Sequence, residues 1–390
     1  MPATCSFVQV EFKLSGTGLD TPYTLVFMDI ILTDIQARRV QRMARQSQPC
    51  LRLIRKAPCG HPTACPAELI EQVVRPVLEM LDIIRENEPV HVRIFGTGRK
   101  TTYPGIQLHR TTAHIPSGSF DEIVASASEL GLTLKEAGVR IFVDGPSLCV
   151  LGLIQTNLAK TTKGQLSRKV HPFAQGLTLA SEFCGTYACD PHSPRLGKPT
   201  YGIPPVLTIE ELRSFSDGVG PVTGAAVLHD VVTYLEELHA SPMEVLVYAL
   251  AVVRPSLGGL SLPRPEVNKP LDLSAKQLKM ITHKRITPDL YWKAYEEAVE
   301  YDGSDHNSEE AIKRDKRRIV DYQTLGITVF PATKDCFKDT QSADAYMRSI
   351  TRHMEKYEGA TFRRRMDRLF KDEGHRTRRE MLRKAIQSCP

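Results

Sequence analysis

The chain has no apolar run that approaches the roughly 20 residues needed to cross a bilayer. Its N-terminus has no basic stretch followed by an apolar core, so we do not expect a secretory signal. The sequence also has no internal repeat and no low-complexity tract. These absences argue against a membrane protein and against a repeat array, and they predict a soluble, cytoplasmic protein.

Paired Cys-x-x-Cys knuckles are also missing from the chain. The nine cysteines are scattered and odd in number, which favours reduced thiols that are mostly buried as small hydrophobic side chains. Cys50, Cys59, His61 and Cys65 could together bind zinc. Their spacing favours ordinary thiols over a zinc site.

The charge of the chain is gathered near its C-terminal end. The 390 residues are 41% hydrophobic and 25% charged, which suits a globular protein of two or three domains. The net charge is +6, and residues 361–390 alone hold ten basic and four acidic residues, again a difference of six. A surface for phosphate backbones and a solvated helix with internal ion pairs both explain this clustering. Arg363, Arg364 and Arg365 are the candidate nucleic-acid contacts.

Changes of hydrophobic period divide the chain into four parts and predict an α/β (α+β) fold. The first part is an extension that could be disordered. The second is mostly helical, with a helix over Asp29–Gln46 that could belong to a winged-helix-like DNA-binding region. The third is an α/β region with a loop-rich linker at 171–203, and the fourth is the final domain. The parts are 1–27, 28–88, 89–205 and 206–390.

Several elements are expected within these parts. Ala67–Glu88 has the spacing of an amphipathic helix that Pro76 should kink or divide. Gly96–Lys100 joins two predicted strands, and a hairpin turn is favoured there over a phosphate-binding loop. Thr208 and Ser241 each precede a glutamate by three residues, which is typical of a helix start. The remaining predicted strands and helices are Val90–Phe95, Gly105–His109, Val139–Val143, Pro146–Leu158 and Val222–His239.

Residues 287–333 contain most of the candidate catalytic and metal-binding residues. Ile286–Trp292 and Glu297–Tyr301 are β-compatible, and the four residues between them suit a hairpin loop. Pairing Trp292 with Glu297 places Asp289 opposite Glu300. Directly opposed residues share a face, and Asp302, two residues after Glu300, points the same way.

Three carboxylates on one patch repel one another unless a cation offsets their charge. Oxygen ligands alone favour Mg²⁺ or Mn²⁺ over zinc, so Asp289, Glu300 and Asp302 are the predicted metal ligands. His306, just past the turn, could act as a general base or position a water. The alternative is a solvated acidic sheet face with an ordinary turn at Asp302-Gly303.

A basic helix is expected after this turn, starting near Ser308. Lys313, Lys316, Arg317 and Arg318 are candidate nucleic-acid contacts beside the acidic patch. Asp315 and Arg318 are three residues apart on this helix and could simply pair with each other. Gly326 ends the helix, and Ile327–Phe330 is the third predicted strand. Strand–strand–helix–strand–helix with a carboxylate patch is a nuclease-like layout.

This region resembles the very-short-patch-repair endonuclease-like branch of the PD-(D/E)XK nuclease superfamily. The matching segments cover about 239–340 and are Ser241-Pro242-Met243-Glu244, Asp289-Leu290, Glu300-Tyr301-Asp302-Gly303 with His306, Asp315 with Arg318, and Gly326-Ile327-Thr328-Val329. The resemblance implies a restriction-endonuclease-like domain with a central sheet flanked by helices. It implies catalytic roles for Glu244, Asp289, Glu300 and His306 in DNA cleavage.

The sequence departs from the superfamily pattern at one position. A lysine is expected two residues after the second acid, and Asp302 stands there. His306, a second metal or a lysine elsewhere, such as Lys313, would have to take its role. Residues 90–190 more faintly resemble antitoxin regulators of the abortive-infection type, through Ile106-Gln107-Leu108-His109-Arg110 and Gly138–Val143. We therefore expect a metal-dependent DNA endonuclease, or alternatively a non-catalytic DNA-binding regulator whose protein partner would be a toxin.

Overall fold

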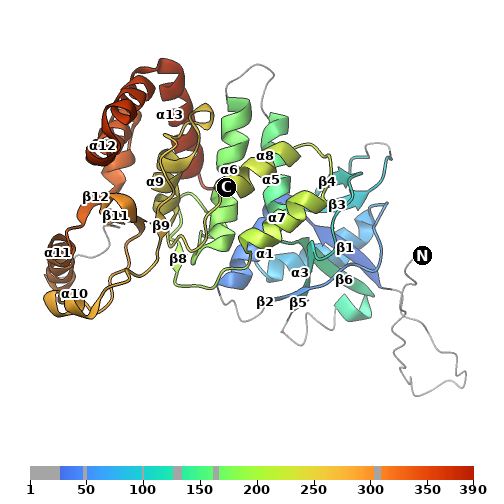
Figure 1. The fold of residues 1–390 in the computed structure, drawn as a ribbon. Helices are drawn as coiled ribbons and strands as arrows, with labels where there is room; N and C mark the ends of the chain where they lie inside the picture. Colours follow the sequence, from blue (N-terminus) through green and yellow to red (C-terminus); the bar gives the residue numbers. More distant parts are fainter. Residues whose placement is uncertain (1–26, 47–50, 99–100, 126–133, 161–166, 303–308) are drawn as a thin grey trace, which may run out of the picture. The chain divides into compact units, whose positions relative to one another are not determined.

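The computed structural model describes residues 27–46, 51–98, 101–125, 134–160, 167–302 and 309–390 (Figure 1). It combines helices with parallel and antiparallel strand pairs, which confirms the predicted α/β (α+β) class. The chain forms two compact units. Unit 1 holds the described residues up to Gly152 with Gly218–Gly220, and unit 2 holds those of 153–217 and 221–390. These limits differ from the predicted ones, and of the predicted extension only Phe27 is described.

Unit 1 is built around a six-stranded sheet. Its strands are β1 (Met28–Leu32), β2 (Leu51–Arg55), β3 (Val90–Phe95), β4 (Ile106–Thr111), β5 (Phe120–Ala125) and β6 (Val139–Asp144). Their order across the sheet is β2-β5-β6-β1-β3-β4. The pairs β1–β6 and β3–β4 are parallel, and the other neighbours are antiparallel. Ile30, Ile31 and Leu32 are buried inside this sheet, as a strand covered on both faces requires.

The helices of unit 1 flank these strands. α1 (Asp34–Arg45) directly follows β1. The amphipathic segment predicted from Ala67 is a broken helix made of α2 (Ala67–Leu69), a π-helical turn (Ile70–Val74) and α3 (Arg75–Met80). Pro76 is the second residue of α3 and directly follows the π-helical turn, so the predicted disturbance of the helix at this proline is confirmed.

Two predictions for unit 1 were wrong. The expected helix Asp29–Gln46 begins only at Asp34, because the apolar residues before it form β1. Residues 28–88 thus supply two strands to a shared sheet and are not mostly helical. The second error concerns Gly96–Lys100: β3 and β4 run parallel, whereas a hairpin turn joins antiparallel strands.

Unit 2 contains most of the helices. α5 (Pro146–Lys160) begins in unit 1 and continues into unit 2. The other helices are α6 (Ser167–Cys184), α7 (Ile209–Gly218), α8 (Ala225–Tyr234), α9 (Pro242–Val252), α10 (Ala275–Met280), α11 (Glu309–Thr324), α12 (Thr340–Lys371) and α13 (Glu373–Gln387). Helix α6 packs against α8, α9 and α13. A short ribbon joins β7 (Tyr187–Ala188) to β8 (Thr200–Tyr201).

The loop-rich linker predicted at 171–203 was wrong in its first part. Residues up to Cys184 belong to α6, and those from Pro172 onward are buried. Packing against three helices overrides the weak helix propensity of the glycine, serine and threonine residues there. The two predicted helix starts are confirmed, since Thr208 Oγ1 accepts the N–H of Glu211 at 3.1 Å and Ser241 Oγ that of Glu244 at 3.2 Å.

A four-stranded sheet in unit 2 carries the predicted carboxylates. Its strands are β9 (Glu266–Val267), β10 (Leu290–Trp292), β11 (Glu297–Tyr301) and β12 (Thr328–Ala332), in the order β12-β11-β10-β9. β10 is antiparallel to both β9 and β11, and β11 is parallel to β12. Leu290 faces Val299, Tyr291 faces Ala298 and Trp292 faces Glu297, which confirms the predicted register. The predicted strand–strand–helix–strand–helix order is also confirmed.

Candidate functional site

Asp289 lies at the point where the chain enters β10. Its backbone carbonyl accepts the N–H of Asn268 at 3.0 Å, and its carboxylate Oδ2 accepts the N–H of Tyr301, in β11, at 2.6 Å. The carboxylate therefore sits against the last residue of the neighbouring strand. Burial raises the pKa of Asp289, while the Tyr301 N–H and the charge of Arg318 act in the opposite direction.

Glu244 reaches the same region from the first turn of α9. Its side chain is only 5% exposed, and Oε2 accepts the N–H of Ala240 at 2.8 Å and Nδ2 of Asn268 at 2.6 Å. Burial raises the pKa of Glu244, and the negative charge of Asp289 raises it further. The two acids are 45 positions apart in the sequence, and their charges act on each other directly.

Glu300 is held by α11. Arg318 Nη2 donates to Glu300 Oε1 at 2.8 Å and to the carbonyl oxygen of Thr287 at 2.6 Å. The hydroxyl of Tyr322, one turn further along the helix, donates to the same carboxylate oxygen. Burial and the Glu300 charge both raise the pKa of Tyr322, so its hydroxyl stays protonated. Arg318 and Tyr322 thus both hold Glu300 toward α11.

The predicted convergence of three carboxylates was wrong. In the described part of the chain, Asp289, Glu300 and Asp302 do not form a group of three whose carboxylate oxygens lie within 4.8 Å of one another. Arg318 and Tyr322 engage Glu300, and Asp302 is an exposed residue beyond β11 whose N–H donates to Ala332. Glu244 and Asp289 are instead linked through Asn268, whose side chain donates to Glu244 and whose N–H donates to the Asp289 carbonyl.

Several predicted residues lie outside what the structure describes. His306 is among residues 303–308, and the side chains of Lys313, Asp315 and Lys316 are likewise not described. Arg317 is exposed, whereas Arg318 is half-buried because of its contacts with Glu300 and Thr287. The predicted roles of the residues outside the description stay predictions. Cys50, of the predicted zinc alternative, also lies outside it.

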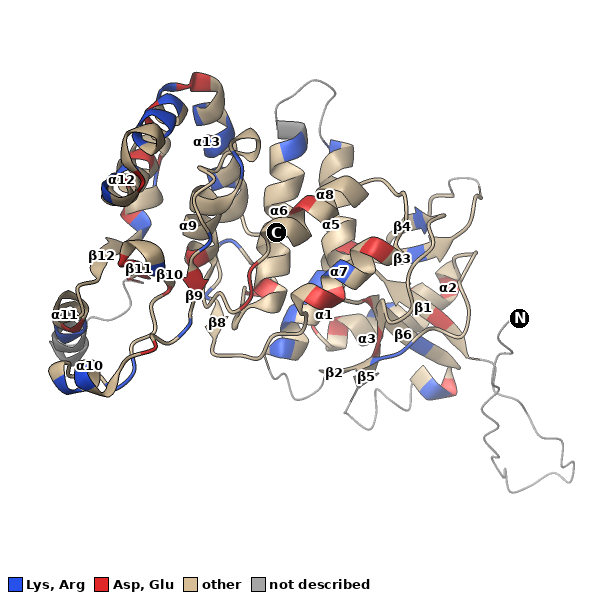
Figure 2. Cartoon of the chain, in the orientation of Figure 1, with Lys and Arg blue, Asp and Glu red and all other residues tan. Residues whose placement is uncertain are grey.

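Helices α12 and α13 carry many of the basic residues, which are blue in Figure 2. Their arginines differ in burial. Arg363, Arg364 and Arg365 are exposed on the second segment of α12, beyond a kink at Gly359. Arg379 and Arg383 on α13 are buried. Arg379 forms an ion pair with Asp344, and Arg383 forms one with Glu380. The predicted internal ion pairs are thus confirmed for Arg379 and Arg383, and the phosphate-binding surface stays a prediction.

Sequence reasoning missed two side chains at this site and one buried acid elsewhere on the same sheet. Asn268 contacts both acids, through its side chain to Glu244 and its N–H to the Asp289 carbonyl, and no pattern in the sequence points to it. Tyr322 is four residues after Arg318 and so lies on the same face of α11, which is a spacing that could have indicated it. Glu297 on β11 is fully buried, and neither of its carboxylate oxygens has a hydrogen-bond partner among the described residues.

Comparison of the chain with protein-family models, with curated proteins and with solved structures found no match. No helix in the described ranges has both the length and the apolar character to cross a membrane.

Proposed function

We propose that unit 2 is a metal-dependent DNA endonuclease that uses Mg²⁺ or Mn²⁺ and acts in DNA repair or in defence against mobile elements. The observation that carries the proposal is that Asn268 bonds to two acids from distant elements, to the carboxylate of Glu244 and to the backbone carbonyl of Asp289. Burial raises the pKa of both carboxyl groups. Such a pair is costly as two negative charges, and a divalent cation would offset that cost. The donors are all oxygen atoms, which fits these two ions.

The residues around this pair have separate roles in the proposed reaction. Carboxylate oxygens of Glu244 and Asp289 would hold the ion, and Glu300 would join them when its contact with Arg318 opens. The bound ion supplies Lewis acidity and a water of lowered pKa. Arg318 would face the negative charge of the phosphate, in place of the lysine that Asp302 replaces. His306 remains the predicted base.

A direct test is cleavage of supercoiled plasmid with Mg²⁺ or Mn²⁺ and with a chelator. We expect nicked or linear DNA only with the metal. Asp289→Asn and Glu244→Gln should each lower the rate by at least about 100-fold, because each removes a ligand of the ion. Glu296→Gln, which changes an exposed acid in the turn between β10 and β11, should leave the rate unchanged. Equal cleavage by wild type and Asp289→Asn would refute the assignment.

A second candidate function has its own observation. The ion pair between Arg318 and Glu300 neutralises one acid that a nuclease would need, which favours a non-catalytic DNA-binding regulator. This alternative predicts a DNA mobility shift that weakens with salt and needs no metal. Metal-independent binding without any cleavage would support it, whereas the absence of a shift at low salt would remove it.

A further inference from the structure

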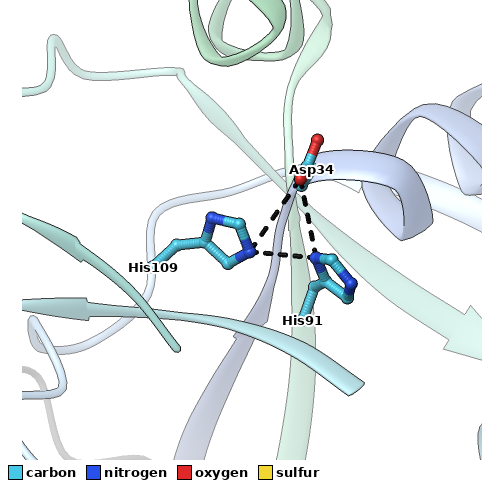
Figure 3. A group of neighbouring side chains, drawn as sticks. All are labelled: Asp34, His91 and His109. Carbon is cyan, nitrogen blue, oxygen red and sulfur yellow. Dashed lines mark hydrogen bonds and ion pairs between the residues drawn. The ribbon is translucent and has the colours of Figure 1, made fainter. Parts of the chain in front are cut away.

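Three potential metal ligands meet in unit 1, on elements that the proposed nuclease site does not use. Asp34 is the first residue of α1, His91 is the second residue of β3, and His109 is the fourth residue of β4 (Figure 3). The N–H of Thr33 donates to the carbonyl of His91 at 3.1 Å, which holds the start of α1 beside β3. His91 is aligned with Gln107 on β4, so His109, two residues on, lies on the same face.

The three ligand atoms form a compact triangle. His91 Nδ1 is 2.9 Å from His109 Nε2, and Asp34 Oδ2 is 3.6 Å from the first and 4.0 Å from the second. The mean of these distances is 3.5 Å. Zinc bonds of about 2.0–2.1 Å in a tetrahedral shell place ligand atoms about 3.3 Å apart. The triangle therefore has the size of one face of such a shell.

We propose that Asp34, His91 and His109 bind a divalent transition-metal ion of the zinc type. Two imidazole nitrogens and one carboxylate favour zinc and its neighbours over Mg²⁺, which prefers oxygen ligands. The side chains are 15%, 16% and 27% exposed for Asp34, His91 and His109, so an ion can reach them and water can complete the shell. Three protein ligands with an open fourth position are typical of a zinc site that does chemistry.

Neighbouring contacts prepare these side chains for an ion. Arg38 Nη1 donates to Asp34 Oδ1 at 2.8 Å, which leaves Oδ2 directed at the two rings.

The nearby guanidinium of Arg93 is paired with a carboxylate, which offsets much of its positive charge. Arg93, which follows His91 by two residues, is bound to Asp144 at 2.8 and 2.6 Å. The backbone at Asp34 has a φ of +55°, a conformation that L-residues rarely adopt. Such strain is kept where the surrounding structure holds a side chain in a particular place. Without an ion, the same three side chains would be a hydrogen-bonded cluster, which is the competing explanation.

Zinc binding by the chelator-treated full chain separates the two explanations. In titration calorimetry, the wild type should bind one more equivalent of Zn²⁺ than His109→Ala does. If both bind this equivalent, the wild type should bind it at least about 10-fold more tightly. Asp34→Asn should behave like His109→Ala. The control is His114→Ala, which removes an exposed histidine of the same unit and should bind as the wild type does. Equal binding by the wild type and His109→Ala, or an equal loss in His114→Ala, would overturn the proposal.

Two additions make the result unambiguous. Zinc could also bind Glu182, Cys189 and Cys389, a second group of potential ligands, but this contribution is the same in every variant and cancels in the difference. If His109→Ala does not fold, X-ray absorption at the zinc edge of the wild-type protein decides. A shell with two imidazoles supports the site, and a shell without them overturns it. Asp289→Asn should still bind the additional equivalent of Zn²⁺. The outcome of this test therefore does not depend on the proposed nuclease site.

Discussion

Arg318 on α11 donates to Glu300 on β11 across 2.8 Å, so the acid of the second strand is paired with a cation from the helix that follows it. Burial raises the pKa of Asp289, and the charge of the Arg318 guanidinium opposes part of that rise. One arginine thus acts on two of the acids assigned to the proposed metal site. Positive charge reaches this region from α11, and Asp302 stands where the resemblance predicts a lysine.

Replacing Arg318 tests whether its charge is used in the proposed reaction. Arg318→Ala should lower the plasmid cleavage rate by about 10- to 1000-fold, because a positioned donor to the phosphate charge is lost. Arg318→Lys should keep part of the rate. The adjacent Arg317→Ala removes the same charge from an exposed position and should have little effect. Equal losses in the two alanine variants would show that only the general charge of α11 matters.

The buried Glu297 should make the stability of the protein depend on pH. Burial raises the pKa of Glu297 from 4.5 to about 8. The folded state holds the proton more tightly, so this contribution to stability is complete below pH 4.5 and is lost as the pH rises through 8. The difference corresponds to roughly 5 kcal/mol at most.

Denaturant unfolding between pH 5 and pH 9 measures this effect. Glu297→Gln should flatten the decline of the unfolding free energy and stabilise the protein at high pH, because the amide carries no charge to bury. Glu296→Gln alters the exposed neighbour and should keep the decline of the wild type. If the pH profiles of the two variants coincide, Glu297 is not the titrating group.

Local patterns predicted much of the fold around the candidate site. The four-residue loop after Trp292 was enough to derive the register of β10 with β11, and Ser241 marked the start of α9. These features depend on residues close together in the sequence. The direction of the Glu300 side chain does not, because Arg318 and Tyr322 reach it from 18 and 22 positions away.

Pairing between distant strands was the part that sequence reasoning could not reach. A short apolar segment such as Asp29–Leu32 fits a strand or a buried helix equally well until its partners are known. Its partner β6 begins at Val139, more than a hundred residues later. The meeting of His91 with His109 likewise depends on the parallel pairing of β3 with β4, which a glycine-containing connection did not indicate.

The proposed metal should stabilise the folded protein through Glu244. Glu244→Gln should be as stable as the wild type, or more stable, in chelator at pH 8, because it removes a buried charge beside Asp289. It should lose the rise in melting temperature that Mg²⁺ or Mn²⁺ gives the wild type, since that rise depends on binding to the folded state. Thermal unfolding with and without the metal measures both effects. A metal-induced rise in Glu244→Gln equal to that of the wild type would remove Glu244 from the ligand set.

The exposed arginines of α12 should contribute to DNA binding but not to stability. Replacing Arg363, Arg364 and Arg365 together by alanine removes three surface cations, whereas the nearby Phe362 and Met366 stay buried. The slope of log affinity against log salt should become less steep by about 2 to 3, because each phosphate contact contributes about 0.9. A mobility-shift titration at several salt concentrations measures the slope.

The matched control for this triple variant removes the same charge elsewhere in unit 2. Lys276, Lys279 and Lys284 are exposed at and just after α10. Their replacement by alanine changes the net charge by the same amount. It should lower the affinity for DNA only through the overall electrostatic potential of the protein, and the slope of log affinity against log salt should stay close to that of the wild type. If both triple variants lose the same slope, DNA binding follows net charge, and α12 has no particular contact with the phosphate backbone.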